Sequence, residues 1–275
     1  KYLTVPELPE VQTVVNQIKS DLLHEKVESI TPIWPKVFHN FTSENVKKNI
    51  KEGQIIDVSR RAKFIIIRFA ESIIAIHLRM TGKLYLLQES QTISKYATAY
   101  FTLKNKKKLI FEDVRKFGRI YLYANMSPID KRHGPEPLES DFTSKSLFKL
   151  IKSKKRNIKA LLLDQSIIAG LGNIYADESL WKSKIHPNSH SHKIPKKRID
   201  KLYYNIRTIL TKAIEQNGTT IIDFSVNGES GKYTNELKVY GKNNSKCYQC
   251  NHEIVKIRVA SRGTYICRKC QKKYK

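Results

Sequence analysis

The chain has 275 residues, 40% of them hydrophobic, which is enough to fill the core of one large domain or of two ordinary ones. Lys and Arg number 51 against 25 Asp and Glu, so the net charge is +26, and the expected partner is nucleic acid or an anionic membrane surface, unless the charge only reflects a lysine-rich composition. No run of about 18 apolar residues and no apolar core of a secretory signal is present, which excludes a membrane-spanning chain and predicts an intracellular one.

The first expected element is an amphipathic helix that follows the segment PELPEV, residues 6–11. Apolar residues recur there at helical spacing, and Glu7 and Glu10 lie at the end where the helix dipole favours negative charge. Short β-rich runs follow at 64–70, 72–79, 83–88, 97–104, 107–114 and 119–123. Closely spaced strands joined by short turns predict an antiparallel β-sandwich.

The composition changes after residue 126. Residues 127–141 contain three prolines and a glycine and show no periodicity, which is typical of a hinge, and helical patterns follow at 144–154, 157–165, 172–184 and 198–216. The sequence thus predicts an α+β protein. Its expected parts are an N-terminal domain at 6–130, a hinge at 131–141, a helical domain at 142–238 and a small module at 239–275 that cannot hold a core of its own.

The small module contains the four cysteines of the chain, Cys247, Cys250, Cys267 and Cys270. Two Cys-x2-Cys pairs separated by 16 residues predict one tetrahedral, four-thiolate zinc site, with iron as a weaker alternative. Four thiolates leave no open position for water, so we expect a structural ion. Basic residues on or beside the expected hairpin, Arg262 among them, offer contacts for phosphates, although solvated arginines are equally common there.

A glycine-rich turn precedes one of the expected helices. Gly170 and Gly172 lie directly before Asn173, where backbone N–H groups at a helix N-terminus can bind an anion. On spacing alone, an ordinary turn between helices is the more common explanation of this pattern.

Several motifs together resemble one family, and they occur in its order over nearly the whole chain. They are PELPEV (6–11), RRAKF (60–64), HLRMTG (77–82), EDVRKFGR (112–119), HGPEPL (133–138), AGLGNIYADESL (169–180), NGTT (217–220) and the four cysteines. The chain resembles the bacterial formamidopyrimidine-DNA glycosylases, which excise 8-oxoguanine and ring-opened purines and then nick the DNA. The resemblance implies an N-terminal β-sandwich with a long first helix, a helix-two-turns-helix domain and a zinc finger.

The resemblance also implies the catalytic groups. Pro6 matches the N-terminal proline that attacks the sugar C1′ and forms an iminium, and Glu7 matches the carboxylate that protonates the ring oxygen. Lys63 matches a lysine that contacts the phosphate near the lesion and assists base departure. Without the other motifs, we would interpret these residues as a helix-entry proline, a helix-dipole glutamate and a solvated lysine.

The expected DNA contacts come from the same match. Met80, Arg115 and Phe117 correspond to the side chains that fill the gap left by the extruded base, although their pattern alone would place Met80 and Phe117 in a core. The phosphate contacts correspond to Lys159, Asn173 and Arg262. The loop at about 225–233, with Gly228 and Gly231, corresponds to a flap over the extruded base.

Three positions depart from the family pattern. A histidine is usual near Tyr96, so no contact is assigned there, and Val114 replaces a common proline, which should leave Arg115 in place. The five residues 1–5 precede Pro6, and a proline inside a peptide bond has no free amine. Our hypothesis is that Val5 records a GUG start codon, read as an initiator methionine that is later removed.

Three other functions remain as alternatives. The related endonuclease VIII branch removes oxidised pyrimidines but typically has glycine in place of Leu8. A DNA-lesion binder without lyase activity is expected if residues 1–5 are retained, and an RNA-binding zinc protein explains only the charge and the cysteines. The favoured prediction is a monomeric enzyme of the bacterial cytoplasm, nucleoid-associated and not membrane-bound, that acts on double-stranded DNA containing oxidised purines, with one zinc ion and β,δ-elimination.

Overall fold

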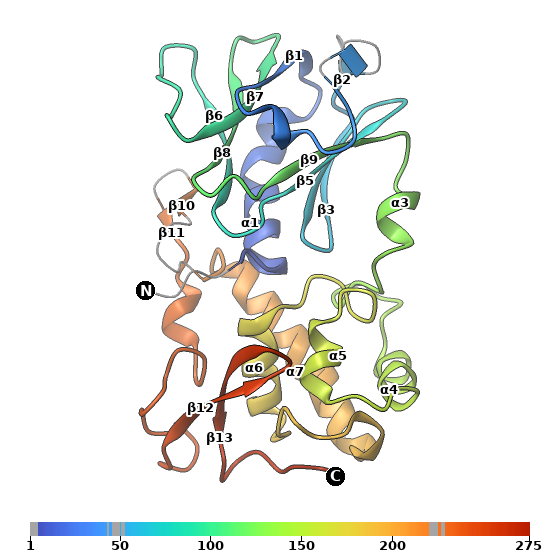
Figure 1. The fold of residues 1–275 in the computed structure, drawn as a ribbon, viewed down its shortest axis with the longest axis vertical. Coiled ribbons are helices and arrows are strands. Elements are labelled where there is room, and N and C mark those ends of the chain that lie inside the picture. Colours follow the sequence, from blue (N-terminus) through green and yellow to red (C-terminus); the bar gives the residue numbers. More distant parts are fainter. Residues whose placement is uncertain (1–4, 43, 46–49, 51–52, 220–224, 227–228) are drawn as a thin grey trace. The chain divides into compact units, whose positions relative to one another are not determined.

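The computed structural model describes residues 5–42, 44–45, 50, 53–219, 225–226 and 229–275. These residues form two compact units (Figure 1). The described residues of Lys1–Lys131 and Asn217–Lys232 form the first unit, and those of Arg132–Gln216 and Tyr233–Lys275 form the second. The helical domain was expected to run over 142–238, but the described residues of Asn217–Lys232 group with the N-terminal unit.

The N-terminal unit contains two antiparallel sheets and the helix α1 (Leu8–Leu22) (Figure 1). The five-stranded sheet has the order β2-β1-β7-β8-β6, from β1 (Lys26–Pro32), β2 (Gly53–Gln54), β6 (Gly82–Leu87), β7 (Ala97–Leu103) and β8 (Lys108–Asp113). The four-stranded sheet has the order β3-β4-β5-β9, from β3 (Asp57–Arg61), β4 (Phe64–Arg68), β5 (Ile73–His77) and β9 (Arg119–Tyr123). The predicted antiparallel sandwich is therefore confirmed.

One hydrophobic core joins α1 to both sheets. The apolar face of α1 is at most 2% exposed, and it packs with side chains of β3, β4, β5, β7 and β8. The strands β1, β2 and β3 were not predicted, because they are rich in polar residues and bury few side chains. Short elements complete the unit: η1 (Pro35–Val37), α3 (Ser127–Asp130), β10 (Ser225–Val226) and β11 (Glu229–Ser230).

The second unit is helical, with a two-stranded hairpin near its C-terminal end (Figure 1). Thr143 and Asn157 accept hydrogen bonds from Ser146 N and Ala160 N, which caps the first two helices. The elements are α4 (Ser144–Lys152), α5 (Ile158–Leu163), α6 (Asn173–Lys182), η2 (Ser191–Lys193), α7 (Lys196–Glu215), η3 (Tyr233–Glu236), β12 (Ile254–Val259) and β13 (Arg262–Cys267). No helix in the described part of the chain is both long and apolar enough to cross a membrane.

The cysteine-bearing segment is part of the second unit, and residues of α6 attach it there. The buried Glu178 carboxylate accepts backbone hydrogen bonds from Lys238, Val239 and Tyr240 at 2.8–3.0 Å. Burial raises the pKa of Glu178, while these N–H groups lower it. Trp181 packs against the hairpin in a shared apolar cluster. The module is too small to form a hydrophobic core of its own, and its apolar side chains therefore pack against the helical unit.

Candidate catalytic and DNA-binding sites

Two of the three residues predicted to be catalytic, Pro6 and Glu7, directly precede α1. Pro6 is buried, and Glu7 is only 3% exposed. The Glu7 N–H donates to Glu10 Oε2 at 2.9 Å, and the Glu7 carbonyl accepts the first helical hydrogen bond from Val11 N at 3.1 Å. Glu10 thus satisfies a backbone donor that a helix N-terminus leaves unpaired, and its negative charge suits the positive end of the helix dipole.

Glu10 also fixes the NGTT motif to the start of α1. Its Oε1 accepts hydrogen bonds from Thr219 N at 2.8 Å and from Thr219 Oγ1 at 2.9 Å. Gly218 has φ +75°, and a Cβ there would lie 2.9 Å from Glu10 Oε1, so only glycine suits this position. Sequence reasoning treated Glu10 only as a dipole partner and missed this contact, because the two residues are 209 positions apart.

The expected flap begins just after this contact. Gly228 and part of the loop lie outside the described residues. In the described part, β10 and β11 pair as a short ribbon, and Thr219 bridges Lys232. A Cβ on Gly231 would lie 2.4 Å from the Gly218 carbonyl oxygen, so the two backbone segments approach closely at the base of the loop.

Lys63 lies in the tight turn between β3 and β4, half-buried, next to Ala62 with φ 53°. Arg60 holds this turn. Its Nη1 donates to the Ala62 carbonyl at 2.9 Å, and its Nε donates to Gln12 Oε1 on α1 at 3.1 Å. Arg60, the first residue of RRAKF, therefore connects the lysine-bearing turn to α1.

Met80, Arg115 and Phe117 form one cluster. Arg115 Nη1 lies 3.1 Å from Met80 Sδ, and the Arg115 guanidinium lies over the Phe117 ring, 4.6 Å from its centroid. Arg115 is exposed, Phe117 is 48% exposed and Met80 is half-buried. A core position for Phe117, suggested by its local pattern alone, is thus wrong. Val114 is 54% exposed, and its replacement of proline leaves Arg115 in the cluster.

In the second unit, Asn173 contacts the hairpin residue that follows Arg262. Asn173 begins α6, and its Nδ2 donates to the Gly263 carbonyl at 3.1 Å. Arg262, directly before Gly263, is exposed at the start of β13 and follows the turn at Ala260 and Ser261, which have φ of 50° and 59°. The glycine-rich turn and the tip of the hairpin are therefore adjacent, as a shared phosphate site requires.

Lys159 occupies a different environment from the one expected for a phosphate contact. Its side chain is 0% exposed, and its Nζ lies 2.6 Å from Asp177 Oδ1 and 2.6 Å from Thr264 Oγ1. Asp177 in turn accepts from Tyr265 N at 2.9 Å. Burial raises the pKa of Asp177 to about 6, against the lowering by the Lys159 ammonium. Lys159 therefore does not lie at a surface that a phosphate can reach, and its ammonium attaches the hairpin to α6.

The four cysteines converge on one point. Their Sγ atoms all lie within 4.8 Å of one another, with separations of 3.3, 3.4 and 3.8 Å for three of the pairs. A tetrahedral ion with Zn–S bonds of about 2.3 Å requires sulfur separations of about 3.8 Å, so the cluster fits zinc. All four ligand positions are thiolates, as expected for a structural ion.

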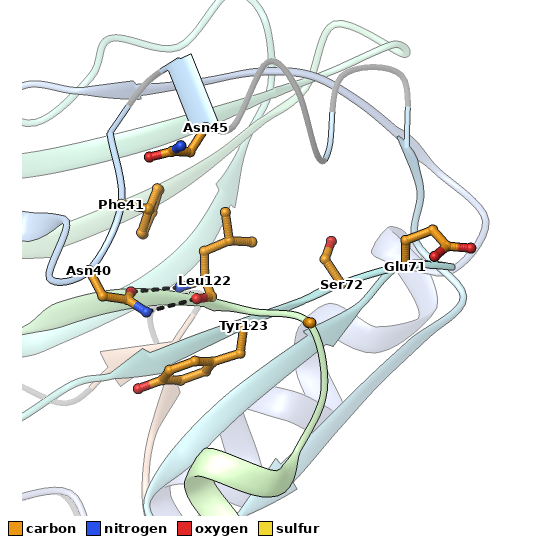
Figure 2. Close-up of a pocket in the computed structure, with 8 residues that line it drawn as sticks. Asn40, Phe41, Asn45, Glu71, Ser72, Leu122 and Tyr123 are labelled. Atoms are coloured by element: carbon orange, nitrogen blue, oxygen red, sulfur yellow. Dashed lines mark hydrogen bonds between the residues drawn. The ribbon is translucent and has the colours of Figure 1, made fainter.

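A separate pocket of about 280 Å³ opens in the N-terminal unit (Figure 2). There the Asn40 amide donates to the Leu122 carbonyl at 2.8 Å and accepts from Leu122 N at 3.0 Å. These two hydrogen bonds attach Asn40 to β9. The pocket is lined by Asn40, Phe41, Asn45, Glu71, Ser72, Leu122, Tyr123 and Ala124. None of the predicted site residues is among them, so this pocket is not the candidate site.

Comparison with family models accounts for most of the chain. Residues 5–120 match the formamidopyrimidine-DNA glycosylase N-terminal domain, and residues 133–225 match the formamidopyrimidine-DNA glycosylase H2TH domain. Residues 244–273 match a zinc finger found in FPG and IleRS. The helix-two-turns-helix domain and the structural zinc finger predicted from the sequence are confirmed.

Individual proteins match over the same extent. Formamidopyrimidine-DNA glycosylases of Protochlamydia amoebophila and Lactobacillus acidophilus are each 39% identical, over 98% of this chain and 100% of theirs. A crystal structure of a Lactococcus lactis FPG mutant with a Fapy-dG containing DNA superposes with a TM-score of 0.91 at 38% identity, covering 98% of this chain and 100% of that one. The L. lactis Fpg complex with an abasic site containing DNA superposes with a TM-score of 0.90 at 38% identity, covering 97% of this chain and 100% of that one.

Proposed function

The chain belongs to the formamidopyrimidine-DNA glycosylase family, and from this we propose that it excises oxidised purines from duplex DNA and then cleaves the strand at the abasic site. The observation that carries the proposal is the start of α1, where Pro6 and Glu7 lie buried together and Glu10 attaches the NGTT segment beside them. A related protein was crystallised with a DNA that contains the ring-opened purine Fapy-dG, which supports the substrate class.

The proposed reaction begins with the Pro6 nitrogen. A terminal amine has a pKa near 8, so an appreciable fraction is unprotonated at neutral pH and can attack the sugar C1′. The C1′–N9 bond breaks, the base leaves with the electron pair and takes up a proton, and Glu7 protonates the ring oxygen as the sugar opens. The product is an iminium, which acidifies the C2′ proton. Loss of that proton expels the 3′ phosphate, and a second elimination expels the 5′ phosphate.

This chemistry needs a free Pro6 amine. Within a peptide bond the nitrogen lone pair is delocalised into the carbonyl and does not attack carbon. We therefore propose that the active form carries Pro6 as its first residue. A form that keeps residues 1–5 would bind lesions without forming the iminium, which is the second candidate function.

The proposed DNA contacts come from both units. Arg262 and Asn173 bind phosphate, and Lys63 binds the phosphate near the lesion. Met80, Arg115 and Phe117 enter the duplex and replace the extruded base, with Arg115 donating to the orphaned cytosine. The net charge of +26 adds long-range attraction that weakens with salt. Lys159 has a positioning role in this proposal.

We also propose that the protein acts as a monomer on DNA in the bacterial cytoplasm, associated with the nucleoid. The support is chemical: a flipped base needs one active site on one strand, and the substrate is genomic DNA.

Substrate comparison tests this function. Protein that begins at Pro6 is mixed in excess with duplexes carrying 8-oxoguanine opposite cytosine, Fapy-dG opposite cytosine, or thymine glycol opposite adenine, and strand cleavage is followed on a denaturing gel. We expect rapid cleavage of both purine duplexes and slow cleavage of the pyrimidine duplex. The reverse preference would favour the endonuclease VIII branch. The matched control retains residues 1–5 and should bind the purine duplexes without cleaving them.

A further inference from the structure

Two separate segments meet at one end of the five-stranded sheet. β6 begins at Gly82 and β8 ends at Asp113, and these two residues are paired in the register of the sheet. The residues just before β6, Met80 and Thr81, therefore lie beside the residues just after β8, which lead to Arg115. All three side chains proposed to enter DNA come from these two short non-strand segments.

The Asp113 carboxylate binds both segments. It is 1% exposed, and its Oδ2 accepts from Gly118 N at 2.6 Å while its Oδ1 accepts from Arg115 N at 3.1 Å. The Thr81 hydroxyl donates to the same Oδ1. Thr81 Oγ1 also accepts from Arg115 N at 3.2 Å. One buried carboxylate thus receives two backbone N–H groups from the 114–118 loop and one hydroxyl from the segment that carries Met80.

The loop needs this support because its backbone is unusual. Lys116 has φ 56°, a left-handed conformation that costs about 1 kcal/mol or more for a residue with a side chain. Its N–H donates to the Asp113 carbonyl at 3.1 Å. Gly118, the next anchored residue, lies so close to the Phe111 ring that a Cβ would be 2.4 Å from it. The loop backbone is therefore closely constrained, while the Arg115 and Phe117 side chains remain exposed.

We propose that Asp113, together with Thr81, is the positioning pair that prearranges Met80, Arg115 and Phe117 for entry into the base stack. The inference rests on the proposed function, since it concerns the step in which the damaged base is extruded. Extrusion costs unstacking and unpairing energy, and side chains that are already ordered lose less entropy when they replace the base. Asp113 itself is buried and does not contact DNA in this proposal. It acts by fixing the backbone at Arg115 and Gly118.

The variants isolate this role. Asp113→Asn keeps the size and one acceptor but replaces the other oxygen by an NH₂ group, which then faces either Gly118 N–H or Arg115 N–H. Thr81→Val removes the hydroxyl that joins the two segments, and Thr81→Ser restores it. Tyr85→Phe is the matched control: it also removes a hydroxyl-to-carboxylate hydrogen bond between β6 and β8, from Tyr85 to Glu112 at 2.9 Å, without touching the loop.

Two substrates separate extrusion from chemistry. All variants are made in protein that begins at Pro6, which serves as the parent. Single-turnover cleavage is measured on a duplex with 8-oxoguanine opposite cytosine and on one with a preformed abasic site, where no base has to leave the stack. A 2-aminopurine next to the lesion reports unstacking by fluorescence. We expect Asp113→Asn and Thr81→Val to slow both the fluorescence change and 8-oxoguanine cleavage by about tenfold to a hundredfold, with abasic-site cleavage within about threefold of the parent. Thr81→Ser and Tyr85→Phe should match the parent.

Three results would overturn the inference. Equal losses on the two substrates would mean that Asp113 only supports the fold, and unchanged rates on both would mean that the loop does not need it. Slower 8-oxoguanine cleavage with an unchanged fluorescence change would mean that Asp113 acts in a step that follows extrusion of the base. Failure of the parent protein to cleave either duplex would instead refute the proposed function.

Discussion

Replacing Lys159 by methionine should strongly destabilise the second unit. The substitution leaves the Asp177 carboxylate, 0% exposed, with its hydrogen bond from Tyr265 N but without the ammonium at 2.6 Å. Removing one partner of a buried ion pair costs about 3–5 kcal/mol, because the remaining charge is uncompensated. The contact from Lys159 to Thr264 is lost as well, so the hairpin that carries Arg262 loses one of its attachments to α5 and α6.

The deficit should depend on pH. Burial raises the pKa of Asp177 to about 6, and without Lys159 the pKa rises further. A carboxyl whose pKa is higher in the folded than in the unfolded chain binds more protons when folded. The free energy of unfolding therefore falls as pH rises, by up to about 1.4 kcal/mol per unit, until the folded pKa is passed. In the parent this fall ends near the pKa of about 6, while in Lys159→Met it continues, so the deficit is larger at pH 8 than at pH 6.

Urea unfolding of the zinc-loaded chain measures this effect. In a Trp34→Phe background, the fluorescence of Trp181 reports the second unit, since Trp181 packs against the cysteine hairpin. Adding Asp177→Asn to Lys159→Met should recover much of the loss and remove its pH dependence, because no unpaired carboxylate remains.

The surface control is Lys196→Met, whose partner Asp200 forms an exposed pair at 3.2 Å. This variant should stay within about 0.5 kcal/mol of the parent. The reasoning is refuted if Lys159→Met unfolds equally easily at pH 6 and pH 8, or if the losses of the single variants simply add in the double variant.

Further predictions concern the hairpin, the catalytic end of α1 and the surface of the hairpin tip. Chelation of zinc should shift the Trp181 fluorescence and abolish tight duplex binding measured by anisotropy, because about 10–16 kcal/mol of apparent metal-binding free energy maintains the finger. Gly218→Ala should lower the free energy of unfolding in urea by about 1–2 kcal/mol and slow excision, since φ is +75° and the new Cβ would meet Glu10. The control for backbone strain is Gly241→Ala, which is also at positive φ but has nothing within 4 Å of the new Cβ. Arg262→Gln should weaken binding to damaged and undamaged duplexes alike and lower the slope of log Kd against log salt by about one, and a loss confined to damaged DNA would contradict a phosphate contact.

Local patterns predicted much of the fold, because the relevant signals were close in sequence. The period of the apolar residues predicted α1, and short β-rich runs at close spacing predicted six of the strands. The spacing of the cysteines predicted their convergence, since each Cys-x2-Cys pair already places two sulfurs together. The sequence did not predict β1 and β3, because they are rich in polar residues and their pairing depends on partner strands elsewhere in the sheets.

The details of the sites depend on contacts between distant residues. Lys159 is buried because Thr264, 105 residues away, and Asp177 meet its ammonium, and no local pattern contains that information. The same holds for Glu10 and Thr219. Phe117 is exposed, although its local pattern resembles that of a core residue, and the neighbouring Gly118 N–H donates to the buried Asp113 carboxylate. Resemblance to a family suggested Lys159 and Phe117 as site residues, but the surroundings of both side chains became known only from the structure.

The central claim is that the Pro6 amine attacks the sugar, and borohydride trapping tests it most directly. Protein that begins at Pro6 is incubated with a duplex carrying 8-oxoguanine opposite cytosine, the mixture is reduced, and the modified residue is located by peptide mass spectrometry. The account predicts a stable protein–DNA adduct on the nitrogen of Pro6, and no adduct with the form that retains residues 1–5. Tight lesion binding without an adduct, or an adduct on a lysine such as Lys63, would contradict it.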